Sequence, residues 1–193
     1  MGLGLLREGI NEVIASTYQN AAPMGIIFRN GEARMMVYRG SHTAGQIEEY
    51  GWIVANFIFD PVLYVRTAFE DLPPEYFFEE DAGGLIVQRL KDTEGWAAYK
   101  AVIERRTRET LVIKLSLLRE EIVSPIIHPV NRGFTSIIEA TVHATRYQIT
   151  AKPDLLGWIE HHATIVRKCG GNREQEALKL LFTFLDKIRK NPG

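Results

Sequence analysis

The hydrophobic pattern of this chain changes its period once, near Gly133. Before that residue, apolar side chains alternate with polar ones or form short unbroken runs between turn residues, a pattern typical of β-strands. After it, apolar residues such as Phe134, Ile137 and Ile138 recur at the spacing of an amphipathic helix. The pattern predicts an α+β chain of 193 residues, with a mainly β body over residues 1–130 and a helical part over residues 131–193.

Turn residues divide the first part of the chain into its expected elements. Asn30-Gly31 lies between two apolar runs, and this dipeptide favours a two-residue hairpin because both residues tolerate a positive φ angle. A hydroxyl at Ser41 or Thr43 and the glycine at Gly51 predict a short helix between them. The apolar runs predict strands at residues 9–18, 23–29, 33–38, 52–59, 62–69, 95–107 and 110–122. Strands of this number and length suit a β-barrel-like body.

The composition narrows the class of protein. The formal net charge of −1 gives no general attraction to nucleic acid or to an anionic membrane. Cys169 is the single cysteine, which rules out an internal disulfide and fits a reducing compartment. No apolar run approaches the ~20 residues of a transmembrane helix, and the first residues lack the apolar block of a signal peptide. We therefore expect a cytoplasmic protein that binds neither nucleic acid nor a membrane.

Gly40-Ser41-His42-Thr43 stands where the predicted short helix begins. A helix N-terminus exposes unpaired backbone N–H groups and carries a partial positive charge, so anions bind there. Ser41, His42 and Thr43 add side-chain donors, and Gly40 lets a ligand approach the backbone. This turn is therefore a candidate phosphate site. The alternative is that Ser41 or Thr43 only caps the helix, which requires no ligand.

Two further features suit a flat ring beside such a phosphate. In Ala22-Pro23-Met24-Gly25, small residues at the start of a strand would let a planar ring lie against the backbone; the alternative is an edge strand that begins with proline. Asn56 interrupts an apolar strand, and its amide must be hydrogen-bonded either to a ligand or to neighbouring backbone. Flavin mononucleotide (FMN) joins a phosphate to a planar ring, and we predict it as the cofactor.

A third polar group lies in the helical part. Glu139, His143 and Arg146 fall at positions i, i+4 and i+7 and therefore share one helix face. Glu139 is expected to raise the pKa of His143, and Arg146 or the earlier Arg132 suits a carboxylate or phosphate. The alternative is a solvated helix face that carries an ordinary i, i+4 pair.

The spacing of histidine, cysteine and carboxylate residues along the chain predicts no metal site. His161 and His162 are adjacent, so their side chains diverge on a helix and do not form a two-ligand motif. A single cysteine also gives no basis for a cysteine-based metal site. We therefore expect no bound metal.

Taken in order, these motifs resemble a known group of proteins. Ala-Pro-Met-Gly-Ile, a hairpin, Ser-x-Thr, a short helix and an apolar strand with an asparagine are similar to the FMN-binding split barrel of flavin reductases. Over most of its length the chain more specifically resembles a largely archaeal family of unknown function, number 447, in which a barrel precedes a helical part. The matching stretches are residues 9–17, 21–25, 41–43, 56–61 and 131–146.

The resemblance implies a split β-barrel followed by a C-terminal helical bundle. It also implies a homodimer in which flavin lies in a groove between two barrels. Ser41 and Thr43 would hold the phosphate with His42 beside them, while residues 22–25 and Asn56 would flank the ring.

The resemblance leaves three functions open. The first is an FMN-dependent oxidoreductase that receives a hydride from a nicotinamide or deazaflavin donor, with Arg132, Glu139 and His143 as candidate catalytic residues that handle the substrate. The second is a binding-only flavoprotein or a structural dimer scaffold. The third is an enzyme of cofactor biosynthesis, linked to methanopterin-dependent one-carbon metabolism, that uses Glu139, His143 and the arginines without flavin redox chemistry.

Overall fold

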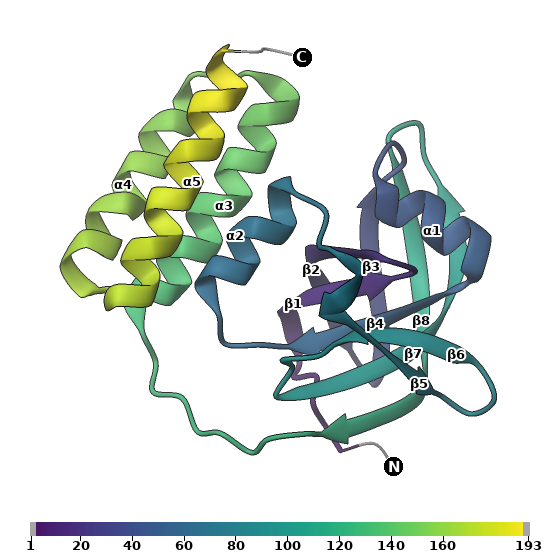
Figure 1. Cartoon of the computed structure of the whole chain (residues 1–193). Coiled ribbons are helices and arrows are strands. Elements are labelled where there is room, and N and C mark those ends of the chain that lie inside the picture. The colour runs from purple at the N-terminus through teal and green to yellow at the C-terminus, as the bar shows by residue number, and fades with distance from the viewer. Residues whose placement is uncertain (1–2, 191–193) are drawn as a thin grey trace. The chain divides into compact units, whose positions relative to one another are not determined.

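The structure is a computed structural model that describes residues 3–190 (Figure 1). Contacts within the chain divide it into two units. The first contains the chain up to Ile58 and the segment Asp71–Ile126, and the second contains Phe59–Glu70 and the chain from Ile127 onward. The division predicted at residue 130 lies close to the last of these boundaries. Residues 59–70, which were expected in the barrel, instead group with the C-terminal helices.

The first unit is a closed six-stranded barrel with a small two-stranded sheet packed against it. Neighbouring barrel strands are antiparallel and follow the order β1-β2-β3-β8-β7-β4. Every strand contributes apolar residues to the interior, among them Val13, Met35 and Tyr99. The barrel strands are β1 Gly9–Thr17, β2 Asn20–Arg29, β3 Glu32–Tyr38, β4 Trp52–Phe57, β7 Gly95–Arg106 and β8 Thr110–Ile122, and the small sheet is β5 Phe77–Asp81 with β6 Ile86–Leu90. The predicted α+β fold, a barrel followed by helices, is confirmed.

Local turn chemistry places the first hairpin and the first helix as expected. Asn30 and Gly31 connect β2 to β3 with φ angles of 52° and 79°, the left-handed values that such a hairpin turn requires. Helix α1 (His42–Tyr50) has Ser41 as its N-cap and ends at Gly51, which adopts a φ of 71°. Because α1 packs against β1, β2 and β3, its first turn is held close to these strands.

The strand expected at residues 62–69 is wrong, because this segment is helix α2 (Pro61–Phe69). The Asp60 carboxylate accepts the backbone N–H groups of Val62 and Leu63. Pro61 occupies the first helical position, where a residue without an N–H is tolerated. An apolar run does not by itself distinguish a strand from a helix. Asp60-Pro61, which ends the preceding strand, is also a helix start.

The connection between α2 and β7 contains a short 3₁₀ turn, Pro74–Tyr76, and the β5–β6 hairpin. The sequence pattern predicts only a long acidic and aromatic connection here. Val87 of β6 is buried against Trp52 and Trp96, which lie on the outer face of the barrel. The hairpin therefore covers part of this outer face, and Leu90 of β6 hydrogen-bonds to Asn56 of β4.

The described part of the second unit contains α2, α3 (Arg132–Thr150), α4 (Asp154–Cys169) and α5 (Asn172–Lys190). Figure 1 shows α3, α4 and α5 side by side, and α2 packs against α3 and α5. Their shared core includes Val65, Ile137, Ile159 and Leu181. Within residues 3–190, no helix combines the length and the apolar character needed to cross a membrane.

A close backbone approach fixes where α3 begins relative to the end of α4. A Cβ atom on Gly133 would lie 2.5 Å from the Cα atom of Gly170. Asn131 caps α3 through the N–H of Gly133 and donates from its Nδ2 atom to the buried Glu174 of α5. The glycine that marks the change of period in the sequence is thus required by packing.

Candidate functional site

The candidate phosphate turn lies at the start of α1. The Ser41 hydroxyl donates to the Tyr38 carbonyl oxygen at 2.8 Å and accepts the N–H of Ala44 at 3.2 Å. Ser41 is therefore a working helix cap. The cap uses the N–H group of Ala44, and the N–H groups of His42 and Thr43, which have no partner within the helix, are the candidate anion-binding element of this turn.

His42 and Thr43 occupy different surroundings in that turn. His42 is exposed, and its Nδ1 atom lies 3.5 Å from the Asp71 carboxylate, a neighbour that does not favour an anion. Thr43 is buried, and its hydroxyl oxygen accepts a hydrogen bond from Asn20 at 3.1 Å. This arrangement leaves the O–H proton of Thr43 available to another acceptor. Of the three side chains, Thr43 is the best placed to donate to a phosphate.

Asn20 links the turn to the strand that carries the second set of predicted residues. It is the first residue of β2, it is buried, and its Nδ2 atom donates to both Thr17 and Thr43. The start of α1 is therefore held beside the start of β2. Residues 22–25 follow within the same strand, so the structure brings the candidate phosphate turn and the candidate ring-binding strand together.

Residues 22–25 alternate between the two faces of β2. Met24 pairs with Val13 and packs on the barrel core, so Met24 and Ala22 face inward while Pro23 and Gly25 face outward. All four residues are half-buried. A Cβ atom on Gly25 would lie 3.0 Å from the side chain of Ile10. The Glu12 carboxylate lies 3.3 Å from the same position, so the absent side chain of Gly25 makes room for two side chains of β1.

Asn56 is at the centre of a buried hydrogen-bond network. Its Nδ2 atom donates to the Ile14 carbonyl oxygen and to the Ser16 hydroxyl, each at 2.9 Å, and its Oδ1 atom accepts the N–H of Leu90 at 2.8 Å. The Ser16 hydroxyl donates in turn to the Gln88 carbonyl oxygen at 2.6 Å. This group, called here the Asn56 network, ties β1, β4 and β6 together. In this structure Asn56 positions strands and offers no unused amide group to a ligand.

A cavity of about 310 Å³ lies in the first unit, away from these residues. It is mostly apolar and is lined by Leu5, Phe28, Tyr99 and Leu117 among others. None of the predicted cofactor-binding residues lines it. The candidate flavin surface is thus separate from this cavity.

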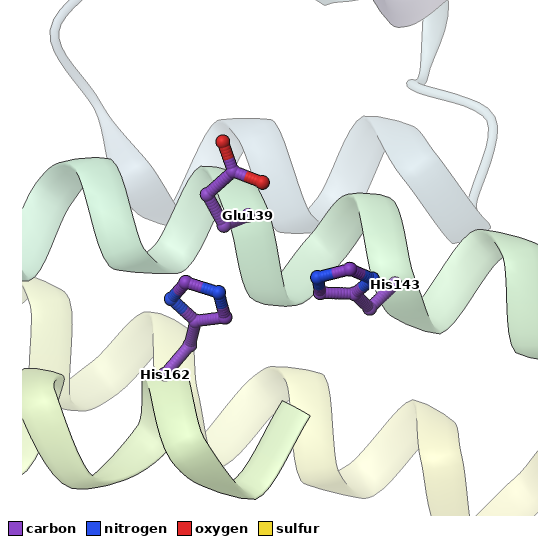
Figure 2. Close-up of side chains that lie close together, drawn as sticks. All are labelled: Glu139, His143 and His162. Carbon is purple, nitrogen blue, oxygen red and sulfur yellow. The ribbon is translucent and has the colours of Figure 1, made fainter. Parts of the chain in front are cut away.

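The second unit brings Glu139 and His143 together with a residue from another helix. Glu139 and His143 lie one turn apart on α3, and His162 extends from α4 toward them (Figure 2). One ligand-type atom of each residue, an imidazole nitrogen or a carboxylate oxygen, lies within 4.8 Å of the other two. We call these three residues the His–Glu cluster. The rings of His143 and His162 stack with their centroids 5.6 Å apart.

Burial has the largest effect on the pKa values of the two histidines in this cluster. It lowers the pKa of His143 below the ordinary value of 6.5, and this effect outweighs Glu139, which raises it, while Arg146 lowers it further. Glu139 does raise the pKa of His143, as expected, but the net change is downward because removing the ring from water disfavours the charged form more strongly. Burial, followed by the nearby His143, likewise lowers the pKa of His162.

Arg132 does not join the other predicted catalytic residues. It is exposed at the first position of α3. His143 lies eleven residues later on the same helix, which corresponds to about 16 Å along the axis. A small substrate does not reach both residues. Arg146, by contrast, is close enough to His143 to influence its pKa.

Two residues at these sites were not found from the sequence. Asn20 precedes the Ala-Pro-Met-Gly motif and has no pattern that indicates a link to Thr43. His162 was set aside because it diverges from the adjacent His161, yet the same divergence turns it toward α3. Spacing within one helix reveals Glu139 and His143, but a partner from a second helix follows only from the packing of α3 on α4.

Family models identify the relatives of this chain. The model for the N-terminal domain of the DUF447 family, a family of unknown function, matches residues 11–124, and the companion DUF447 model matches residues 131–183. The chain therefore belongs to the DUF447 family. The uncharacterized protein MJ1453 from Methanocaldococcus jannaschii is 21% identical, over 92% of this chain and 98% of its own length.

A solved structure of the same family agrees with this assignment. The FMN-bound DUF447 protein MM1853 from Methanosarcina mazei is 37% identical and superposes with a TM-score of 0.85, covering 92% of this chain and 95% of that chain. An FMN-binding protein from Thermus thermophilus is 10% identical, covering 63% of this chain and 76% of that chain, with a TM-score of 0.48.

Proposed function

We propose that this protein binds FMN and acts as a flavin-dependent oxidoreductase in a homodimer. The observation that carries the proposal is the link from Asn20 to Thr43, which holds a helix N-terminus suited to a phosphate beside the strand suited to a flat ring. The FMN-bound family member MM1853, 37% identical, supports the same cofactor.

The residues present fit such a ligand. The first N–H groups of α1 and the hydroxyl of Thr43 would hold the phosphate, while Ser41 orients the helix as its cap. Pro23 and Gly25 would lie against the ring, since they face outward from β2 and Gly25 adds no side chain. Ala22 and Met24 shape the strand from inside the barrel, and we assign His42 and Asn56 supporting positions.

In this proposal the chain's own residues bind and orient the cofactor and limit its contact with water. FMN, when bound, supplies hydride and single-electron transfer. Residues 22–25 are only half-buried in one chain, so a planar ring lying on them would keep one side uncovered. A second copy of the barrel would cover part of that side and leave room for a nicotinamide or deazaflavin donor.

The phosphate assignment can be tested with two flavins that differ only in that group. Wild-type protein should bind FMN more tightly than riboflavin, measured by fluorescence quenching at equilibrium. Ser41→Asp retains a good helix cap but adds a negative charge at the turn, so we expect FMN affinity to fall more than about tenfold, equivalent to about 1.4 kcal/mol. Riboflavin affinity should change little.

A second variant and a control complete this test. Thr43→Val removes the buried hydroxyl at nearly constant volume and should also weaken FMN binding selectively. Ser116→Ala removes an exposed hydroxyl from β8 and should leave both affinities unchanged. Equal losses of FMN and riboflavin affinity in the Ser41 and Thr43 variants would contradict a phosphate site at this turn.

The reaction class and the assembly require separate measurements. Consumption of a nicotinamide or reduced deazaflavin by the FMN-loaded protein would support the oxidoreductase. Tight FMN binding without turnover of either donor would leave a binding-only flavoprotein. Light scattering coupled to size exclusion should give the mass of two chains, and a monomer in the presence of FMN would refute the homodimer.

A further inference from the structure

The His–Glu cluster has two features that its packing alone does not explain. The Nδ1 atoms of His143 and His162 are both buried, and neither has a hydrogen-bond partner. Leaving a buried polar atom unsatisfied has a free-energy cost that an apolar side chain of similar shape avoids. Two such atoms in adjacent stacked rings therefore indicate that something binds between α3 and α4.

The chemistry of the three groups favours a cation as that missing partner. Imidazole binds a metal through a neutral nitrogen, and a carboxylate contributes a negative charge. Burial lowers the pKa of both imidazole rings and so favours the neutral form that binds a metal. Glu139 is exposed and free of a competing ion pair among the described residues, which leaves its oxygens available.

We propose that Glu139, His143 and His162 form a binding site for a divalent transition-metal ion of the zinc class. Two imidazoles and a carboxylate suit Zn²⁺, Co²⁺, Ni²⁺ or Fe²⁺, whereas Mg²⁺ and Ca²⁺ prefer oxygen ligands throughout. The site lies within the helical unit and stands independently of the proposed flavin site. It is a function that the spacing of residues along the chain does not predict.

The geometry is close to what coordination requires. Bonds of about 2.1 Å in a tetrahedral arrangement place ligand atoms roughly 3.4 Å apart. The three atoms here lie within 4.8 Å of one another, so small side-chain rotations bring them onto one ion. Glu139 and His143 come from one helix and His162 from another, so the ion would join α3 to α4 (Figure 2).

Three protein ligands leave one position of a tetrahedral ion for water or for a small ligand. Trp158 lies beside His143, with ring centroids 6.1 Å apart, and Trp158 is more than half exposed. Glu139 is exposed as well, so one side of the cluster faces solvent while the two Nδ1 atoms are buried.

The first experiment measures metal binding directly. Protein without a polyhistidine tag would be stripped with EDTA, transferred to metal-free buffer and titrated with Zn²⁺ against a chromophoric chelator. We expect one ion per chain and a higher melting temperature in the presence of Zn²⁺. Titration with Co²⁺ should give the intense visible absorption of a four-coordinate ion. A wild-type protein that takes up neither metal would overturn the proposal.

Variants assign the ligands. Glu139→Gln changes an exposed residue and does not endanger the fold, and His143→Gln and His162→Gln remove the two rings. Each should weaken Zn²⁺ binding more than about tenfold and abolish the cobalt spectrum, with an unchanged circular dichroism spectrum as the check on folding. His161→Gln, which alters the exposed neighbour of His162, is the matched control and should bind as the wild type does. Equal affinities in the Glu139→Gln variant and the wild type would also refute the site.

Discussion

The Asn56 network and the His–Glu cluster both place polar side chains inside a packed unit, but they differ in whether the polar atoms find partners. In the Asn56 network, the amide nitrogen and the amide oxygen are both hydrogen-bonded, and so is the hydroxyl of Ser16. In the His–Glu cluster, one nitrogen of each histidine is buried with no partner. The Asn56 network thus has a structural role that its own hydrogen bonds explain, whereas the two unpartnered nitrogens are the observation behind the proposed ion.

The largest predicted effect is at Asn56. Asn56→Leu removes the donor to Ile14 and the acceptor of the Leu90 N–H, which leaves buried backbone groups unpaired. We expect the free energy of unfolding to fall by about 3 kcal/mol, measured by urea denaturation. Gln148→Leu changes an exposed amide and serves as the control. If Asn56→Leu lowered the free energy of unfolding by less than about 0.5 kcal/mol, the Asn56 network would not contribute more to stability than the His–Glu cluster does.

A smaller effect is expected at Asn20, which links Thr17 to Thr43. Asn20→Ala should lower the unfolding free energy by about 1–2 kcal/mol through the two lost hydrogen bonds. It should also weaken FMN binding more than riboflavin binding, because the turn at Thr43 loses its support. Comparing urea denaturation with flavin titration separates the two effects. Unchanged flavin preference would show that the link to Thr43 serves stability alone.

Arg34 provides an exposed polar cluster for comparison, since it pairs with Glu32 at 2.7 Å and Glu104 at 2.8 Å. Hydrogen bonds from Arg34 lower the pKa of both carboxyl groups below 4.5 in the folded state. Their contribution is therefore present above pH 4.5 and is lost as the pH falls through the folded pKa values. Arg34→Gln should destabilise slightly at pH 7 and progressively less below pH 4.5, as followed by urea denaturation.

The smallest change in the free energy of unfolding is expected for a His162 variant when no metal is present. His162→Leu replaces an unpartnered buried nitrogen with an apolar group, so in EDTA the unfolding free energy should stay within about 0.5 kcal/mol of the wild-type value. Added Zn²⁺ should stabilise the wild type but not this variant. A large loss in EDTA would mean that His162 makes a contact as important as those of Asn56, and the comparison would then fail.

The first hairpin and the first helix could be predicted because their signals are local. The Asn30-Gly31 turn, the Ser41 cap and the Gly51 stop each depend on the conformation of a few neighbouring residues, and all three occur as expected. Residues 62–69 could not be assigned from their apolar run, since a buried helix and a buried strand look alike over eight residues. The Asp60-Pro61 pair resolves that ambiguity only when it is interpreted as a helix start.

The sites show the same limit. Ser41 and Thr43 were found because a helix N-terminus has a sequence signature, and Glu139 with His143 because they share a helix face. The roles of Asn56, Asn20 and His162 depend on partners from other elements, on β6, α1 and α3 respectively. Such partners follow from tertiary packing, which periodicity along one strand or helix does not specify.

The division of the chain into two units, each made of two separate segments, has a consequence for biosynthesis. Helix α2 leaves the ribosome before β7 and β8, but its packing partners α3 and α5 are made only after both strands. Until then, Val62 and Val65 have none of their helical neighbours to pack against. A nascent chain that pauses after Ile126 carries a bare apolar helix, available to a chaperone or a protease. A self-contained barrel would therefore need residues 59–70 excised as well as the C-terminal helices removed.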